Sequence, residues 1–174
     1  ASTLFENLVF DAVYREATDH DKKVLLHDRI TRDIATIQRQ IACFNAELEM
    51  HQFVREQGAI SSIELRDIMT KYLRAYLGKG VEVNNNDGYS YVYWSHLRYG
   101  FYVYTYAFGL LMSTIMADHY KEDPGYIQEI DRFLKAGKSD TVANIFASIG
   151  IDVTKPETFT RALKNQEADI AAFK

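Results

Sequence analysis

A histidine and a dense group of tyrosines are the residues of this chain that are best suited to chemistry. The segment "WSHLRYGFYVYTYAFG", residues 94–109, places His96 shortly before Tyr99, Tyr102 and Tyr104. A phenol is a hydrogen-bond donor that resists ionisation at neutral pH, because its ordinary pKa is about 10. Two or three such donors beside a histidine can polarise a carbonyl group, and loss of one oxyanion donor typically raises the barrier by about 3–4 kcal/mol. The segment therefore predicts one half of a hydrolytic site, without a nucleophile.

The same segment also fits a purely structural role, since aromatic faces of helices usually pack into a protein core. Its residues 101–108 alternate with the period of two that is typical of a strand. The apolar run continues without a turn through residues 110–120, however, and is then too long for a strand. We therefore expect a helix from about Tyr99 to Lys121.

Helical geometry would sort the aromatic residues into two stripes. Tyr99, Tyr102 and Tyr106 fall on one stripe at spacings of three and four, and His96 precedes it by three residues. Tyr104 falls on the other stripe. Spacing alone thus favours His96, Tyr99 and Tyr102 as the group that meets a substrate together.

The rest of the chain reads as helix with one clear break. Apolar residues recur at helical spacing in several further segments, namely 2–19, 21–57, 61–77, 125–136, 140–149 and 156–172. Ser61 with Glu64, and Thr154 with Glu157, have the spacing of capping boxes at helix starts. Residues 78–93 are rich in Gly and Asn, which is turn chemistry. We predict an all-α fold, a single domain over residues 1–174 with about six or seven helices and one irregular loop at about 78–93.

Composition excludes several classes of function. The chain has 174 residues, 47% of them apolar, and a net charge of −4 with scattered basic residues. Such a charge predicts no nucleic-acid partner and no attachment to an anionic membrane. The most apolar stretch, residues 101–117, is short and carries tyrosines, so we interpret it as a core helix rather than a membrane span. Cys43 is the single cysteine, which suits the cytoplasm.

Metal chemistry finds little support in the residues themselves. None of the five histidines is followed by Glu, so the zinc-binding H-E-x-x-H pattern is absent from the chain. Glu47 and His51 share a helical face with Glu49 nearby, but the paired Glu-x-x-His motifs of a di-iron bundle are missing. Cys43 has no adjacent histidine and is interpreted as a small buried residue. We predict no metal site within the chain.

The order of motifs along the chain resembles a known family. The pattern W-S-H-x-x-Y-x-F-Y-V-Y-T-Y-A-x-G, "QRQIACFNAELEMH" and the tail "FLKAGKSDTVANIFASIGIDVTKPE" are similar to segments of oligoendopeptidase F. That enzyme is a bacterial member of the thimet-oligopeptidase-like zinc metallopeptidases. The opening residues "ASTLFEN" resemble those just beyond the glutamate that is the third zinc ligand. The resemblance covers nearly the whole chain.

The resemblance implies the C-terminal helical part of an enzyme that hydrolyses short peptides. The zinc ligands and the catalytic Glu of such an enzyme would lie upstream of this chain, so no cofactor is expected within it and it should be inactive alone. By position, His96 matches the histidine that contacts the peptide carbonyl. Tyr102 and Tyr104 are the candidate oxyanion donors, and Tyr99 is a substrate-binding residue. The resemblance leaves open which of the two donors meets the oxyanion.

A second hypothesis belongs to another class of protein. The chain could be a free-standing helical binding or oligomerisation module whose tyrosines form its core. It would then bury Tyr99 and Tyr102 with their hydroxyl groups satisfied internally. Under the first hypothesis the partners are a short peptide and the N-terminal remainder of the peptidase. A homo-oligomer formed through exposed apolar surface is compatible with both.

Overall fold

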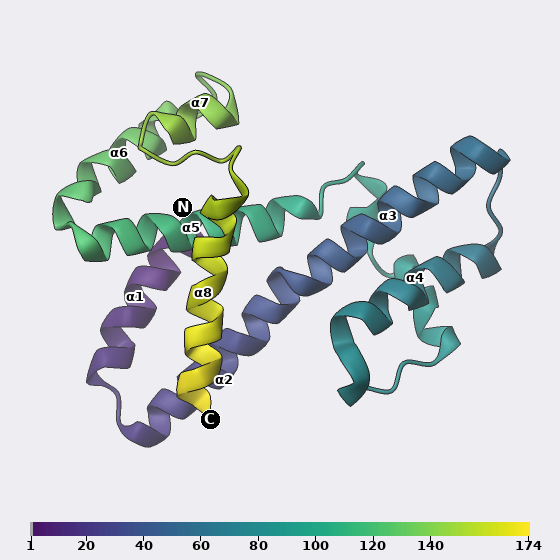
Figure 1. The fold of residues 1–174 in the computed structure, drawn as a ribbon, viewed down its shortest axis with the longest axis horizontal. Helices are drawn as coiled ribbons and strands as arrows, with labels where there is room; N and C mark the ends of the chain where they lie inside the picture. Colours follow the sequence, from purple (N-terminus) through teal and green to yellow (C-terminus); the bar gives the residue numbers. More distant parts are fainter. Residues whose placement is uncertain (1) are drawn as a thin grey trace. The chain divides into compact units, whose positions relative to one another are not determined.

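The computed structural model describes residues 2–174, and these residues contain helices but no strand (Figure 1). Their eight α-helices are α1 (Ser2–Glu16), α2 (Asp19–Thr36), α3 (Gln38–Gln57), α4 (Ser62–Leu77), α5 (Tyr104–Glu122), α6 (Ile127–Ala136), α7 (Val142–Ala147) and α8 (Pro156–Phe173). The predicted all-α fold is confirmed. One helix more than predicted arises at residues 21–57, where Ile37 separates α2 from α3 while the backbone hydrogen bonds continue across it.

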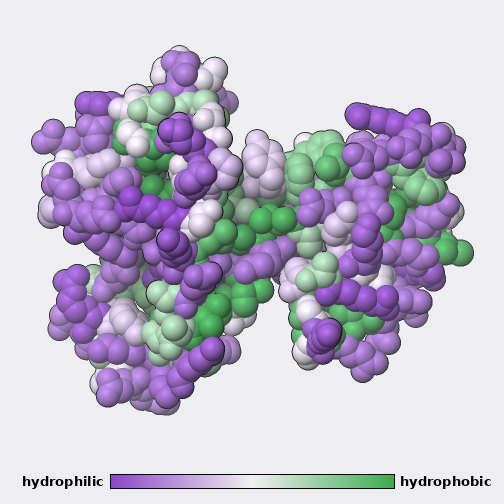
Figure 2. Space-filling view, in the orientation of Figure 1, coloured by the Kyte–Doolittle hydropathy of each residue, from purple (hydrophilic) through white to green (hydrophobic). Residues whose placement is uncertain are grey.

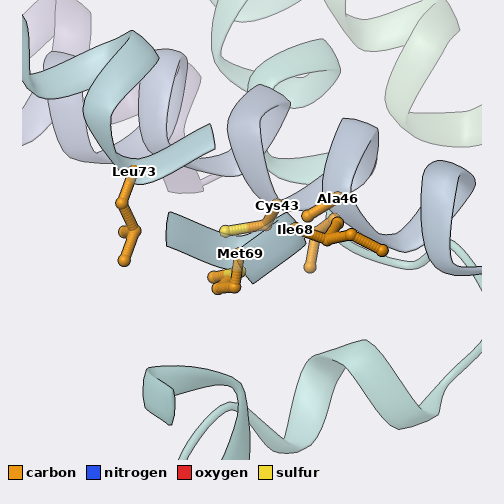
Figure 3. Close-up of a cluster of buried hydrophobic side chains, with 6 residues drawn as sticks. Cys43, Ala46, Ile68, Met69 and Leu73 are labelled. Carbon is orange, nitrogen blue, oxygen red and sulfur yellow. The ribbon is translucent and has the colours of Figure 1, made fainter. Parts of the chain in front are cut away.

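The chain divides into two compact units, of which the second spans Asp33–Phe108. The core of this unit joins α3 to α4 through buried apolar side chains (Figure 3), namely Cys43, Ala46, Ile68, Met69, Leu73 and Val103. The predicted capping box forms at the start of α4, where Ser61 Oγ accepts from the Glu64 N–H and Glu64 accepts from the Ser61 N–H. Gly58 is the C-cap of α3, and its N–H donates to the Val54 carbonyl.

The predicted irregular segment is ordered as short 3-10 helices. These are η1 (Gly78–Gly80) and η2 (Asn85–Val92), and η2 lies against α4. Thr70 on α4 donates to the Asn85 carbonyl at 3.2 Å, and the Arg74 guanidinium donates to the Val83 carbonyl. Gly88 approaches α4 so closely that a Cβ at this position would overlap the Arg66 carbonyl oxygen. The loop is therefore a packed part of the unit.

The helix predicted for residues 99–121 begins later than expected, and that prediction is wrong for its first five residues. Ser95–Arg98 form the 3-10 helix η3, and α5 starts only at Tyr104. Gly100 and Phe101 separate the two with positive φ angles of 56° and 60°. Two successive residues in the left-handed region cannot continue a right-handed helix. Tyr99 and Tyr102 therefore do not share the helical stripe that was predicted for them.

The other unit consists of residues 2–32 and Gly109–Lys174. Its buried apolar side chains include Leu4, Leu26, Leu110, Met112, Ile115, Met116, Ile130, Phe146, Ile151 and Ala162. Arg29 on α2 is 8% exposed and lies in ion-pair contact with Asp169 on α8 at 2.9 Å. Lys121 on α5 pairs with Asp11 on α1 at 2.7 Å. These ion pairs join α2 to α8 and α5 to α1, in addition to the apolar core of the unit.

The second predicted capping box does not form. Thr154 donates its hydroxyl to Asp152 at 2.6 Å, and Lys155 is the residue before α8, with no side-chain cap. Pro156 occupies the first helical position, where its missing N–H removes a donor that would need a cap. Helix α8 thus starts by a different device from the one that its sequence predicted.

The surface carries both strongly polar and strongly apolar residues. Figure 2 shows hydrophobic residues among hydrophilic ones, and the large exposed apolar side chains of the unit that contains α1 include Phe5, Val9, Val13 and Val24. Among residues 2–174, no helix combines the length and the apolar character needed to cross a membrane.

Candidate functional site

Three tyrosine rings surround the His96 imidazole. The Tyr102 ring stacks on it, with 5.7 Å between centroids and 14° between planes. Tyr106 and Tyr99 present their rings edge-on to the imidazole, at 5.6 Å and 6.2 Å. We refer to His96, Tyr99, Tyr102 and Tyr106 as the tyrosine cluster. All four residues belong to the unit that spans Asp33–Phe108.

A hydrogen bond joins two members of the tyrosine cluster, Tyr106 and His96. The Tyr106 hydroxyl lies 3.0 Å from His96 Nε2, and the direction of the proton depends on the imidazole tautomer. Partial burial, with a smaller contribution from the neighbouring Tyr102, raises the pKa of the Tyr106 phenol above its ordinary value. The Tyr106 phenol therefore stays neutral at physiological pH and keeps its proton for hydrogen bonding.

The cluster is open to solvent. Tyr99 is 66% exposed, Tyr102 is 44% exposed and Tyr106 is 36% exposed. A core role would bury these rings and satisfy the hydroxyl groups internally, so the interpretation of Tyr99 and Tyr102 as core residues is wrong. Their exposed phenols form a surface of aromatic faces and hydrogen-bond donors around a histidine.

The turn before α5 holds the cluster in place. Gly100 and Phe101 reverse the chain between Tyr99 and Tyr102, and a left-handed conformation costs a non-glycine residue about 1–2 kcal/mol. The Phe101 N–H donates to the Glu47 carboxylate on α3 at 2.7 Å. The Phe101 ring packs against Phe44, with 5.6 Å between centroids. Contacts with α3 therefore offset the strain of the turn.

Tyr104 lies apart from the other predicted site residues. Its ring stands edge-on to Phe44 at 6.2 Å, and the side chain is 52% exposed. Tyr104 and Tyr106 are two residues apart at the start of α5, which places them on different sides of a helix. The structure thus brings together His96, Tyr99 and Tyr102, and it adds Tyr106, which helical spacing had already grouped with them.

Glu47 is the residue whose role sequence reasoning missed. Its place on one helical face with His51 was considered for a metal site and rejected, and the structure buries Glu47 against the turn. Glu49 instead accepts from Lys71 and Tyr72 on α4, at 2.6 Å each. The position of Glu47 within the apolar pattern of α3 could have indicated a buried carboxylate. Its partner could not be found from spacing, because Phe101 lies 54 positions away.

Neither metal ligation nor thiol chemistry is supported by the side chains present. Across the described part of the chain, no three His, Cys, Asp or Glu side chains gather as a metal site would require. The zinc ion that the sequence resemblance implies therefore has no ligand set within residues 2–174. Burial raises the pKa of the Cys43 thiol to about 12, against a smaller opposing effect of Arg39. Cys43 is thus a buried packing residue, as its sequence context predicted.

Comparison with known proteins gives one consistent family. The family described as "Peptidase family M3" matches residues 1–165. The chain is 26% identical over 166 residues to group B oligopeptidase PepB of Streptococcus agalactiae serotype III (strain NEM316). This alignment covers 94% of this chain and 28% of that protein. It is 24% identical over 166 residues to oligopeptidase PepF of Bacillus subtilis (strain 168), covering 94% of this chain and 25% of that protein.

A solved structure has the same fold. The crystal structure of oligoendopeptidase-F from Enterococcus faecium superposes with a TM-score of 0.81 and 24% sequence identity. It covers 98% of this chain, which in turn spans 34% of that protein. The chain therefore corresponds to a minor part of its relatives' length. Because the family match extends over residues 1–165 of 174, the chain belongs to peptidase family M3.

Proposed function

We propose that this chain is the C-terminal part of a zinc-dependent oligopeptidase that hydrolyses short peptides. The observation that carries the proposal is the open tyrosine cluster, in which His96 contacts exposed phenols in a chain of a peptidase family. Under the proposal, this cluster forms one wall of the peptide-binding cleft. The N-terminal remainder of the peptidase is then the partner that supplies the other wall.

The cluster has the groups that a peptide carbonyl requires. His96 and the Tyr102 hydroxyl would donate hydrogen bonds to the carbonyl oxygen and stabilise its negative charge as the tetrahedral intermediate forms. Tyr99, which is the most exposed of the cluster tyrosines, would bind the peptide through its ring and hydroxyl. Tyr104 is the second candidate for the oxyanion donor, and its 52% exposure leaves its hydroxyl accessible.

The contact geometry favours Tyr102 over Tyr104 as the partner of His96. Tyr102 stacks on the imidazole, whereas the Tyr104 ring contacts Phe44. A donor that acts together with His96 must reach the same oxygen atom, within about 2.7–3.1 Å. Because the Tyr102 ring stacks on the imidazole, we expect its hydroxyl to lie close to the carbonyl oxygen that His96 would contact.

Zinc would come from outside this chain. Since residues 2–174 contain no group of three metal-binding side chains, we expect the zinc ligands in the segment upstream of residue 1. The chain alone is then an incomplete enzyme. The single cysteine continues to favour a cytoplasmic location.

Kinetics of the complete peptidase test the proposal. The gene that encodes this chain is first read upstream of Ala1, where an H-E-x-x-H motif and a later Glu are expected. Tyr102→Phe, Tyr104→Phe and His96→Ala are then compared in the complete enzyme with an internally quenched peptide. Loss of the oxyanion donor should lower kcat by roughly 100-fold. The matched control is Tyr93→Phe, since Tyr93 is 89% exposed and lies outside the tyrosine cluster.

Each result decides between the two hypotheses. A large loss with Tyr102→Phe and His96→Ala, and none with Tyr93→Phe, supports the peptidase assignment. An upstream sequence without the zinc motif would leave the free-standing module as the better account. Unchanged kinetics in all the variants of an active complete enzyme would contradict the role proposed for the tyrosine cluster. Exposed apolar residues on α1, including Val9 at 60%, would then favour a homo-oligomer, measured as the mass in solution.

A further inference from the structure

Glu47 is a buried carboxylate that the proposed reaction does not use. It is 2% exposed, and its Oε1 accepts the Phe101 N–H at 2.7 Å. Its Oε2 is also buried and has no hydrogen-bond partner among residues 2–174. An ionisable side chain is rarely buried with so few partners unless a particular arrangement depends on it.

The group that Glu47 contacts is the strained part of the cluster's backbone. Phe101 has a φ of 60°, and Gly100 before it has a φ of 56°. The backbone hydrogen bonds of Tyr99 to His96, and of Thr105 to Tyr102, lie on either side of the turn. The N–H of Phe101 takes part in neither bond and donates instead to Glu47 on α3. Glu47 therefore fixes the peptide plane between the two segments that carry the tyrosines.

Apolar packing holds the same turn but cannot fix its direction. Val103 is 2% exposed and belongs to the buried apolar core of the unit. Such contacts are non-directional, since they depend on buried area rather than on the angle of one bond. A hydrogen bond to a charged acceptor depends on both length and angle. The orientation of Tyr102 over His96 thus depends on the Glu47 contact.

We propose that Glu47 is a positioning residue for the tyrosine cluster. Its carboxylate holds the left-handed turn at Gly100–Phe101, and the turn aligns Tyr99 and Tyr102 about His96. Glu47 does not touch the substrate and acts only through the turn. The proposal rests on the proposed function for its effect on catalysis, but its effect on the cluster can be measured without activity.

The first test observes the cluster in the chain itself. His and Tyr rings are isotopically labelled, and the chemical shifts of His96 and Tyr102 are compared in Glu47→Ala and Glu47→Gln. Glu49→Gln is the matched control, because it removes a carboxylate two residues away that contacts α4 instead of the turn. Glu47→Ala should move the ring shifts of both residues toward unstacked values. Glu47→Gln keeps an acceptor for Phe101 and should restore them, and Glu49→Gln should leave them unchanged.

The second test separates positioning from stability in the complete peptidase. Glu47→Ala should lower kcat by roughly 10- to 100-fold while KM changes by less than about threefold, because a misplaced group affects the transition state most. Glu47→Gln should recover most of kcat. A variant that merely lowered the folded fraction would reduce the concentration of active sites. Its kcat would then be unchanged once the rate is divided by the concentration of folded protein.

Three outcomes would overturn the proposal. Unchanged His96 and Tyr102 shifts in folded Glu47→Ala are one, and failure of Glu47→Gln to restore them is another. If Glu47→Ala does not fold, amide hydrogen exchange of the unmodified chain decides: a Phe101 N–H that exchanges as fast as an unprotected loop amide excludes the contact. The ring shifts could instead follow the prediction while His96→Ala leaves the kinetics of the complete peptidase unchanged. That result would contradict only the proposed function.

Discussion

The Tyr106 hydroxyl lies 3.0 Å from His96 Nε2, and this contact joins the first turn of α5 to the 3-10 helix η3. The two residues are ten positions apart, with the left-handed turn between them. Helix α5 thus supplies a fixed point for the imidazole that the turn alone does not provide. The raised pKa of the Tyr106 phenol keeps this partner of the contact neutral over the physiological range.

Replacing Tyr106 by Phe should loosen His96 without unfolding the chain. The hydrogen bond is partly exposed, so its loss is expected to lower the free energy of unfolding by only about 0.5–1.5 kcal/mol. The ring ¹⁵N shifts of His96 should change, because Nε2 loses its partner. Urea unfolding and histidine NMR measure the two effects. Identical His96 shifts in the two proteins would show that the contact does not form in solution.

Gly88→Ala should destabilise the unit that contains α3 and α4. An added Cβ would overlap both the Arg66 carbonyl oxygen and Thr70 Oγ1, so η2 would have to move away from α4. Overpacking of this kind typically costs about 1–3 kcal/mol. Gly80→Ala is the matched control, since nothing lies within 4 Å of its Cβ position. Equal urea midpoints for the two variants would contradict the close approach of η2 to α4.

Local sequence signals predicted the helices well where local bonds determine them. Ser61 and Glu64 form the predicted capping box through reciprocal hydrogen bonds between residues three positions apart. Thr154 has the same spacing to Glu157, but Asp152 takes its hydroxyl and Pro156 sets the start of α8. A spacing rule cannot include such competitors.

The grouping of His96 with Tyr99 and Tyr102 was predictable, whereas Tyr104, which was also predicted for the site, lies against Phe44. His96, Tyr99 and Tyr102 do meet, although a helix was the wrong reason for expecting them to. The turn that breaks the helix depends on Glu47, a residue 54 positions earlier in the chain. Periodicity within residues 99–121 carries no information about a contact with α3. Long-range hydrogen bonds of this kind are what the sequence pattern leaves out.

Cys43 should resist thiol reagents while the chain is folded. Its thiol is buried, and burial raises its pKa to about 12, so the reactive thiolate is scarce near neutral pH. Because the folded pKa lies above the unfolded value, the resulting contribution to stability is fully present below the unfolded pKa and is lost as pH rises through the folded pKa of about 12. Labelling by a chromogenic disulfide should therefore be slow in buffer and fast in urea. Rapid labelling of the folded chain would show that Cys43 is accessible.

The Glu49 carboxylate should give the α3–α4 contact a dependence on acid. Hydrogen bonds from Lys71 first, and then from Tyr72, hold the pKa of Glu49 below its ordinary value. A lowered folded pKa contributes stability above the unfolded value, and this contribution is lost as pH falls through the folded pKa. Glu49→Gln should thus cost about 0.5–1 kcal/mol at neutral pH, since the pair is partly exposed, and much less in acid. A difference that stayed constant between neutral pH and acid would contradict a role for the charge.

The isolated chain should neither hold stoichiometric zinc nor cleave peptides. Residues 2–174 offer no group of three metal-binding side chains, and the tyrosine cluster supplies donors without a nucleophile. Peptide should still bind weakly at the exposed cluster, where Tyr99 and Tyr102 carry accessible rings. Zinc content after dialysis, quenched-peptide hydrolysis and tyrosine ring shifts during peptide titration measure the three properties. Retained stoichiometric zinc or steady hydrolysis would contradict a metal site upstream, whereas binding that survives His96→Ala with Tyr102→Phe would place the peptide elsewhere on the chain.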